Sequence, residues 1–223
     1  MQKLLFSKEK NLELFLKQKK FKKIFILCGE KSFIKSGAKK IITKHVKDKI
    51  VKYYFKKSPY PEINEAKKIN FHLKIFAPDL MIAIGGGSVL DYAKIANIIS
   101  SIDNLEKKII NFNYPIKKKI TSLLAIPTTS GSGAEVTSSA VIYINKIKYS
   151  LESPAIKPDY FFLIPELVIK ASKKIKSSSG FDAIAQAIES LISKKSNFQS
   201  VRFAKKSLDI SLKYYLDYLN KPN

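Results

Sequence analysis

Arginine is almost missing from this sequence, and its scarcity argues against a nucleic-acid-binding protein. Lysine and arginine together number 41 among 223 residues and give a formal charge of +23, yet Arg202 is the only arginine. Proteins that read bases and phosphates favour arginine, because its planar guanidinium donates two hydrogen bonds side by side. The lysines are also spread through every segment. We therefore expect no specific nucleic-acid partner, only weak and salt-sensitive attraction to polyanions.

Cysteine and long apolar runs are equally scarce. The single cysteine, Cys28, cannot form an internal disulfide, and its neighbours Ile26 and Leu27 predict a buried thiol in a reducing compartment. No apolar run approaches the ~18 residues of a membrane span. The apolar patch in residues 1–10 is too short for a secretory signal. These features predict a cytoplasmic protein with no membrane partner.

The chain does contain enough apolar residues for a substantial core, since 45% of the sequence is hydrophobic. Buried strands are indicated by apolar runs at 23–28, 50–55 and 80–84, and helices by amphipathic stretches at 8–20, 38–45 and 62–76. This alternation predicts an α/β fold, in which crossover helices join the strands of a parallel sheet.

A glycine turn follows the most apolar of these strands. The run at 80–84 ends at Gly85, Gly86 and Gly87, and Ser88 is expected to cap the helix that follows. A strand, a glycine turn and a helix start leave backbone amides and the positive end of a helix dipole at one spot, which suits a phosphate group. The alternative is a structural turn whose glycines only supply positive φ.

A second polar loop follows another strand. The strand expected at 122–126 stops at Pro127, and residues 128–132 offer hydroxyl groups and free amides. Because open α/β sheets bind ligands at the carboxyl ends of their strands, this loop and the glycine turn are expected to share a site. The alternative for this segment is a flexible serine-rich loop.

The pattern of apolar residues changes near residue 165. Strand patterns disappear after it, and Ser177–Gly180 is expected to lead into a helix with its apolar side at Ala183, Ile184, Ala187, Ile188 and Leu191. A last amphipathic helix is expected at 198–219. We therefore predict an α/β domain at 1–165 and the start of an all-helical domain at 166–223.

Four motifs in order resemble the iron-containing alcohol dehydrogenase family. They are GGGSVLDYAK at 85–94, PTTSGSGAEVT at 127–137, PELV at 165–168 and GFDAIAQAIES at 180–190. The resemblance implies a Rossmann-like domain for NAD or NADP, then a helical domain that holds a divalent metal, iron or zinc. It also implies a hydride transfer between NAD(P)H and a small aldehyde or alcohol in the cleft between the domains.

The resemblance also implies cofactor-binding residues, although it assigns no catalytic residue. The glycine turn with Ser88 matches the pyrophosphate-binding turn, and Asp91 matches an aspartate near the cofactor. The second loop lies against the phosphates and ribose in the family, which implicates Thr128, Thr129 and Ser132. Lys148, which follows a strand expected at 140–144, resembles a lysine that contacts the nicotinamide ribose, or it is one more solvated lysine. Gly29 stands where NAD-preferring members carry an acidic residue, so the choice between NAD and NADP stays open.

The metal site departs from the family pattern. Asp182 matches the first metal ligand, but the histidine expected one helical turn later is replaced by Gln186. An amide oxygen is a weaker ligand than imidazole for iron or zinc. The two histidines, His45 and His72, lie in the predicted cofactor domain and are not expected to be ligands.

Family members continue for a long helical stretch beyond the part that this chain matches. The resemblance therefore implies a truncated reading frame, a split gene or a decayed copy, and a homo-oligomer or a separately encoded C-terminal half as partner. The segment at 140–160 together with Gln186 is most similar to members that reduce phosphonoacetaldehyde or similar small aldehydes. The competing interpretation is a catalytically empty nucleotide-binding remnant.

Overall fold

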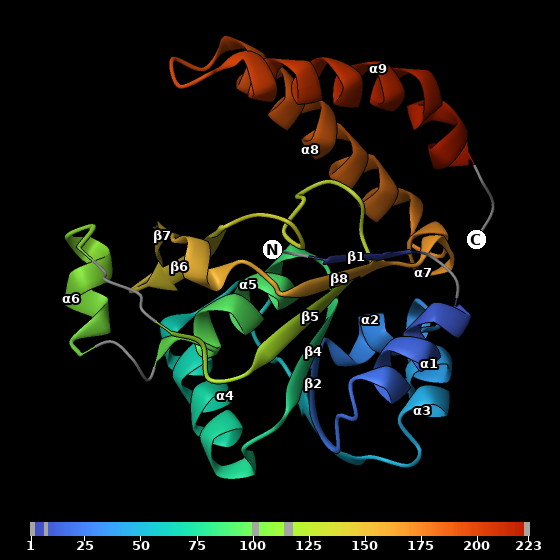
Figure 1. The fold of residues 1–223 in the computed structure, drawn as a ribbon. Coiled ribbons are helices and arrows are strands. Elements are labelled where there is room, and N and C mark those ends of the chain that lie inside the picture. The colour runs from blue at the N-terminus through green and yellow to red at the C-terminus, as the bar shows by residue number, and fades with distance from the viewer. Residues whose placement is uncertain (1–2, 7–8, 100–102, 114–117, 221–223) are drawn as a thin grey trace.

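The computed structural model describes residues 3–6, 9–99, 103–113 and 118–220 (Figure 1). The elements are β1 (Lys3–Phe6), α1 (Glu9–Gln18), β2 (Lys23–Cys28), α2 (Glu30–Lys35), α3 (Ala38–His45), β3 (Ile50–Phe55), α4 (Ile63–Phe76), β4 (Leu80–Gly85), α5 (Gly87–Ala96), α6 (Leu105–Ile110), β5 (Ser122–Pro127), β6 (Ser139–Ile144), β7 (Ile147–Glu152), the 3₁₀ helix η2 (Pro154–Ile156), β8 (Tyr160–Leu163), α7 (Pro165–Ile169), α8 (Lys173–Ile192) and α9 (Phe198–Asn220). Within these ranges, every helix is too short or too polar to cross a bilayer.

Six strands form the main sheet in the order β1-β8-β5-β4-β2-β3, and all neighbouring pairs are parallel. The predicted α/β class is therefore confirmed. From β2 the chain moves outward to β3 at one edge, whereas from β4 it moves to β5 on the other side. The carboxyl ends of β2 and β4 thus flank the topological switch point, where open α/β sheets bind ligands. Gly29 follows β2 there, and Gly85 ends β4.

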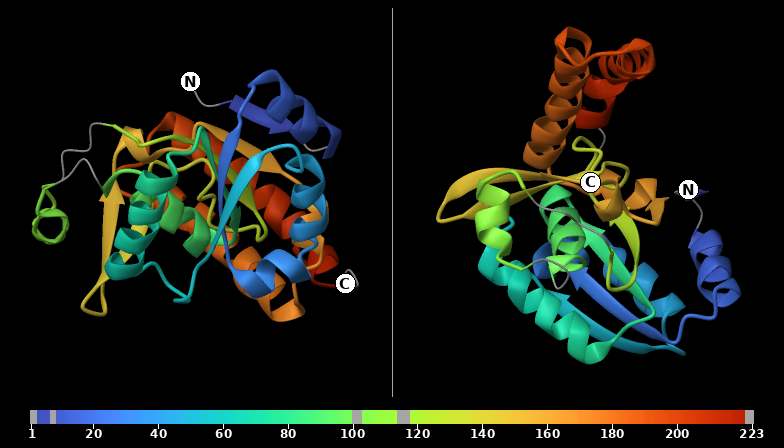
Figure 2. Two further views of the ribbon diagram at one scale, coloured as in Figure 1. Left: turned by 90° about the horizontal axis from the view of Figure 1, so that it is seen from below. Right: turned by 60° about the vertical axis from the view of Figure 1, so that its left-hand side comes forward.

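Helices cover both faces of the sheet over two apolar cores. Successive strand residues face opposite sides, so Ala83 lies in one core and its neighbours Ile82 and Ile84 lie in the other. The first core packs against α4, α5 and α6, and the second packs against α1, α2, α3 and α7 (Figure 2). Cys28 is fully buried in the second core, as predicted, and burial raises the pKa of its thiol to about 12.

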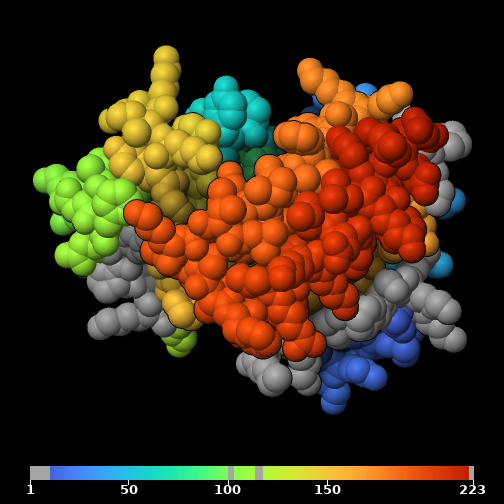
Figure 3. Space-filling view, turned by 90° about the horizontal axis from the view of Figure 1, so that it is seen from above, coloured from blue at the N-terminus to red at the C-terminus, as the bar shows by residue number. Residues whose placement is uncertain are grey.

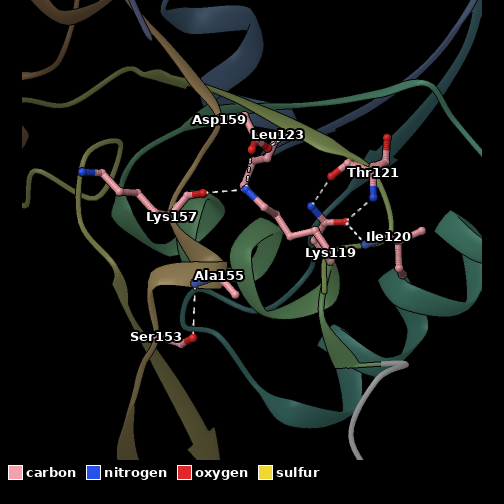
Figure 4. Close-up of polar contacts among 9 residues, drawn as sticks. Lys119, Ile120, Thr121, Leu123, Ser153, Ala155, Lys157 and Asp159 are labelled. Carbon is pink, nitrogen blue, oxygen red and sulfur yellow. Dashed lines mark hydrogen bonds and ion pairs between the residues drawn. The ribbon is translucent and has the colours of Figure 1, made fainter. Parts of the chain in front are cut away.

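Polar side chains fasten the sheet at the amino ends of its strands, away from the switch point (Figure 4). Asp159 accepts hydrogen bonds from the Leu123 amide at 2.8 Å and from the Lys119 amine at 2.7 Å. The buried Asn97 side chain accepts from the Thr121 amide at 3.0 Å and donates to the Thr121 carbonyl at 2.8 Å. These groups satisfy backbone atoms where the strands begin, so their role is structural.

A separate antiparallel hairpin, formed by β6 and β7, lies between β5 and β8 in the chain. Its turn is Asn145-Lys146, with positive φ of 50° and 66°. The sequence predicted β6 but not β7, β1 or β8. Strands β1 and β8 have only four residues each, and β7 buries only Leu151, so none shows a clear apolar pattern.

Beyond β8 the described residues form helices only. The expectation that Ser177–Gly180 leads into this helix is wrong. The helix, α8, begins just after Ser172, whose hydroxyl caps it. The serines lie inside α8, and the Tyr215 hydroxyl of α9 donates to the Ser177 carbonyl at 2.9 Å. A Cβ on Gly180 would lie 2.5 Å from Cε2 of Tyr215, so glycine allows the two helices to approach. The helical part starts where the division at 165 was placed, and the division into two domains stays a prediction.

Helices α8 and α9 carry many exposed apolar side chains. Ile188 was expected on the buried side of α8, but it is 44% exposed, while Ile184 and Ala187 are buried. The large exposed side chains are Ile175, Phe181, Ile188 and Ile192 on α8, and Phe198, Phe203, Ile210, Leu212, Tyr214 and Leu216 on α9. The two helices lie side by side across one face of the molecule (Figure 3). We call this set the exposed apolar side chains of α8 and α9.

Candidate functional site at the switch point

The chain passes from β4 into α5 through the glycine turn at 85–87. Gly86 is the N-cap residue, with an extended backbone (φ −75°, ψ −178°) and no side-chain cap. The expectation that Ser88 caps the helix is therefore wrong, since α5 begins at Gly87 and Ser88 lies in its first turn. None of these three glycines has positive φ. The alternative that they only supply positive φ is therefore also wrong.

Close neighbours explain the glycines instead. A Cβ on Gly86 would lie 3.2 Å from Oγ1 of Thr129. A Cβ on Gly87 would lie 3.0 Å from Oγ of Ser132. The turn and the second loop therefore face each other without a turn side chain between them. The first amides of α5 lack intrahelical partners and carry the positive end of the helix dipole, so an anion is favoured at this position.

The second loop, residues 128–132, is packed between the glycine turn and α8. The amide of Thr128 donates to the carbonyl of Gly85 at 3.0 Å, which continues the pairing of β5 with β4. On the other side, a Cβ on Gly131 would lie 2.3 Å from the carbonyl oxygen of Ser179 in α8. Glycine at this position therefore lets α8 sit directly on the loop.

An open pocket of about 460 Å³ lies between the turn, the loop and α8. Its lining residues are Gly87, Thr129, Ser132, Ser178, Ser179, Phe181, Asp182 and Ala185. The fold thus brings three predicted cofactor residues together with the predicted metal residue Asp182. A larger pocket of about 690 Å³ lies near the hairpin turn, and its described lining residues include none of the predicted site residues.

Sequence reasoning missed Ser178 and Ser179 as pocket residues. The hydroxyl oxygen of Ser179 is buried without a hydrogen-bond partner among the described residues, although a buried hydroxyl normally has one. The run of three serines before Gly180 was a usable signal. Because the sequence predicts a helix start at these serines, it does not predict that they line a pocket.

Asp91 and Lys148 lie on neighbouring elements outside the pocket. Lys148 is exposed on β7, opposite Tyr143 of β6, rather than in the segment after a single strand. Asp91 points from α5 to the hairpin, and its carboxylate accepts a hydrogen bond from the Val141 amide at 3.2 Å. The positive charge of Lys148 is close enough to lower the pKa of Asp91.

Lys94, one helical turn after Asp91, was also missed. Its side chain is 1% exposed, and its amine donates to Oγ1 of Thr137 at 2.9 Å and to the carbonyl of Ser139 at 2.8 Å. Burial lowers the pKa of Lys94 to about 8, against the opposing effect of Asp91. Burial also raises the pKa of Asp91 to about 6, against the effect of Lys94. A lysine three positions after an aspartate on an otherwise apolar helix was the signal.

The donor set at Asp182 does not fit an iron or zinc ion. Both Asp182 and Gln186 are exposed on α8, one turn apart as predicted, and the Gln186 amide nitrogen donates to Asp182 at 2.8 Å. Among the described residues, no three His, Cys, Asp or Glu side chains gather at a place that could hold a metal. One carboxylate and one neutral amide fall short of the roughly four ligands, with nitrogen or sulfur among them, that zinc sites use.

Comparisons with known proteins match this chain to one family over most of its length. The family pattern described as iron-containing alcohol dehydrogenase matches residues 2–165. An alcohol dehydrogenase of Thermococcus barophilus is 36% identical over 135 residues, which are 58% of this chain and 36% of that protein. A 1-propanol dehydrogenase of Citrobacter freundii is 34% identical over 159 residues, which are 70% of this chain and 40% of that protein.

A solved structure shares the fold over nearly the whole chain. It is the sulfoacetaldehyde reductase from Bifidobacterium kashiwanohense in complex with NAD+, with a TM-score of 0.86 and 25% identity over 99% of this chain. The match covers 60% of that protein's chain. This chain therefore spans less than half the length of the two sequence relatives and about three fifths of the solved one.

Proposed function

Because the chain belongs to the iron-containing alcohol dehydrogenase family, we propose that it binds a nicotinamide dinucleotide at the switch point and serves a hydride transfer between NAD(P)H and a small aldehyde or alcohol. The observation that carries the proposal is the pocket in which the glycine turn, the second loop and α8 meet. It joins unpaired amides, the positive end of α5 and four hydroxyl-bearing residues at one place. Such a site is suited to a pyrophosphate.

The chain's own residues hold and orient the cofactor in this proposal. Gly85, Gly86, Gly87 and Ser88 hold the pyrophosphate, and Thr128, Thr129 and Ser132 lie against the phosphates and ribose. Lys148 contacts the nicotinamide ribose. Ser179 of α8 also lines the pocket, although its hydroxyl oxygen is itself buried. The cytoplasmic location stays a prediction.

For the substrate we propose a short aldehyde that carries an anionic group, as phosphonoacetaldehyde does. The sulfoacetaldehyde reductase supports this class, because its named substrate combines an aldehyde with a sulfonate. The lysine-rich chain, with a formal charge of +23, would also attract such an anion. Steady-state assays of phosphonoacetaldehyde against propanal test the proposal, and equal kcat/KM values for the two aldehydes would count against it.

For the cofactor we propose a preference for NADP, based on the end of β2. Gly29 carries no carboxylate to bind a ribose hydroxyl or repel a 2′-phosphate. A Cβ on Gly29 would lie 2.9 Å from Oγ of Ser32, so a hydroxyl group lies beside it. Lys56 is also near, with its Cε 3.9 Å from that position, although its amine donates to the carbonyls of Ser58 and Pro59. Glu30, the next residue, begins α2.

Gly29→Asp should reverse this preference. The new carboxylate would repel a 2′-phosphate and accept hydrogen bonds from ribose hydroxyls, and we expect each affinity to change by about tenfold, or ~1.4 kcal/mol. Fluorescence titration with NADPH and NADH gives both Kd values for the parent and the variant. If the parent binds NADH more tightly than NADPH, the proposed NADP preference is refuted, whereas the proposal that the chain binds a dinucleotide stands.

A second candidate function is nucleotide binding without turnover by this chain alone. The hydrogen bond between Gln186 and Asp182 favours it, because the two groups satisfy each other where the family places a metal. No step of the hydride transfer is therefore assigned to a metal held by these two residues. Assays of the purified chain with NADPH and short aldehydes separate the two candidates.

Calorimetric titration with zinc and ferrous iron should show no one-to-one site of micromolar or tighter affinity. The reason is that the Asp182 carboxylate and the Gln186 amide supply too few ligands. Gln186→His alone should not create such a site, since one imidazole and one carboxylate still leave about half the ligands missing. A micromolar site in the parent that disappears in Asp182→Ala would contradict this expectation and strengthen the full enzymatic function.

For the partner we propose a helical polypeptide that covers the exposed apolar side chains of α8 and α9, in preference to a second copy of this chain. Two copies would bring together two chains with a formal charge of +23 each, and that repulsion opposes self-association. The isolated chain should therefore bind dyes that detect exposed apolar surface and should associate only as the salt concentration rises and screens its charge. Light scattering at low and high salt measures this, and a monomer without dye binding under both conditions would contradict the proposal.

A further inference from the structure

The two charged side chains of α5 reach out of the helix to the hairpin. Asp91 accepts from the amide of Val141 at 3.2 Å, and the Lys94 amine donates to the carbonyl of Ser139 at 2.8 Å. Lys94 also donates to Thr137, just before β6, at 2.9 Å. Both side chains thus bond the same segment, residues 137–141, from the same helix.

The hairpin depends on such bonds because it lies outside the main sheet. β6 pairs with β7 in a separate two-stranded sheet. Its backbone also meets the loop before α4, where the Tyr143 amide donates to the Pro61 carbonyl at 2.6 Å. Isolated two-stranded hairpins are only marginally stable in water, so this hairpin depends on its packing in the first core and on its hydrogen bonds to α5.

The same helix begins at the glycine turn. Gly87 is the first residue of α5, Asp91 lies about one turn later and Lys94 about one turn after that. Lys148, on β7, is close enough for its charge to act on Asp91. The charged groups that face this junction are Asp91 and Lys94 from α5, Glu135 from the preceding loop and Lys148 from β7.

We propose that Asp91 and Lys94 are positioning residues, which fasten the hairpin to α5 and thereby set the distance between the Lys148 amine and the glycine turn. This proposal rests on the proposed function, in which Lys148 contacts the nicotinamide ribose. Asp91 then acts on the cofactor through Lys148 rather than by touching it. The arrangement accounts for two ionisable side chains at a buried junction that apolar residues could otherwise fill.

A double-mutant cycle tests the proposal with NADPH as the probe. Asp91→Ala should weaken NADPH binding by about tenfold in the parent and have almost no effect in a Lys148→Met background, because the two residues act in series. Asp79→Ala is the matched control, since Asp79 also accepts backbone amides, those of Lys22 and Lys23, but lies at the amino end of the sheet. Equal and additive losses from Asp91→Ala in both backgrounds would overturn the proposal.

Amide hydrogen exchange of residues 139–152 gives a second readout that does not need cofactor binding. Asp91→Ala and Lys94→Met should each speed exchange across the hairpin, at Val141 above all, while Asp79→Ala should not. If the parent fails to bind NADPH, the proposed function fails, and the exchange rates alone decide whether the hairpin is fastened by these residues. Unchanged exchange in both variants would overturn the fastening.

Discussion

Gly87→Val should abolish saturable NADPH binding while the chain stays folded. A Cβ on Gly87 would lie 3.0 Å from Oγ of Ser132, and the two methyl groups of valine would occupy the pocket beyond it. A phosphate could no longer reach the amides at the start of α5. We expect a loss of about 100-fold or more in affinity, or ~3 kcal/mol.

Fluorescence titration with NADPH measures this loss, and urea unfolding verifies the fold. Lys39→Val is the matched control, because it places the same side chain on the solvent side of the first turn of α3. It should bind NADPH like the parent. A Gly87→Val variant with the parent's Kd would show that the glycine turn does not hold the cofactor, and the proposed function would lose the observation that carries it.

Asp91→Asn should change how the stability of the chain depends on pH. Burial raises the pKa of Asp91 from 3.8 to about 6, although Lys94, the Val141 amide and Lys148 oppose the shift. Between these two values the folded chain binds more protons than the unfolded chain. The contribution of Asp91 to stability is therefore present at pH 4 and is lost as the pH rises through about 6.

The variant lacks this titration, so its stability relative to the parent should improve as the pH rises from 4 to 7. Two pKa units correspond to about 3 kcal/mol, an order-of-magnitude figure. Urea unfolding of both proteins at pH 4, 5, 6 and 7 measures the difference, and the subtraction removes every other titrating group. A difference that stays constant with pH would mean that the Asp91 carboxylate is not ionised at a buried position.

This result would bear on why the charged pair is present at all. At pH 7 both Asp91 and Lys94 are mainly charged, since burial lowers the pKa of Lys94 only to about 8. Each charge then lowers the stability of the fold at neutral pH. Residues that reduce stability and still bind two elements together are expected at functional junctions, where placement matters more than stability.

Local sequence patterns were sufficient to predict the elements around the site. The residues of β4 are apolar and fully buried, and they end at a glycine turn. A short apolar run with such an end predicts a buried strand. The strands β2 and β3 and the helix α3 were predicted at the same residues for similar reasons. Short or half-exposed strands carry too few buried residues to leave a pattern, so β1, β7 and β8 were missed.

Tertiary structure decided which side chains line the pocket. The sequence separates Gly87, Ser132 and Asp182 widely, and only the parallel strand order and the contact of Gly131 with Ser179 bring them to one pocket. Strand order is not encoded in any single segment, because it depends on how all crossover helices pack together. In the same way, the family resemblance implied that Asp91 lies near the cofactor, but only the packing of the hairpin on α5 directed its carboxylate to a backbone amide of β6.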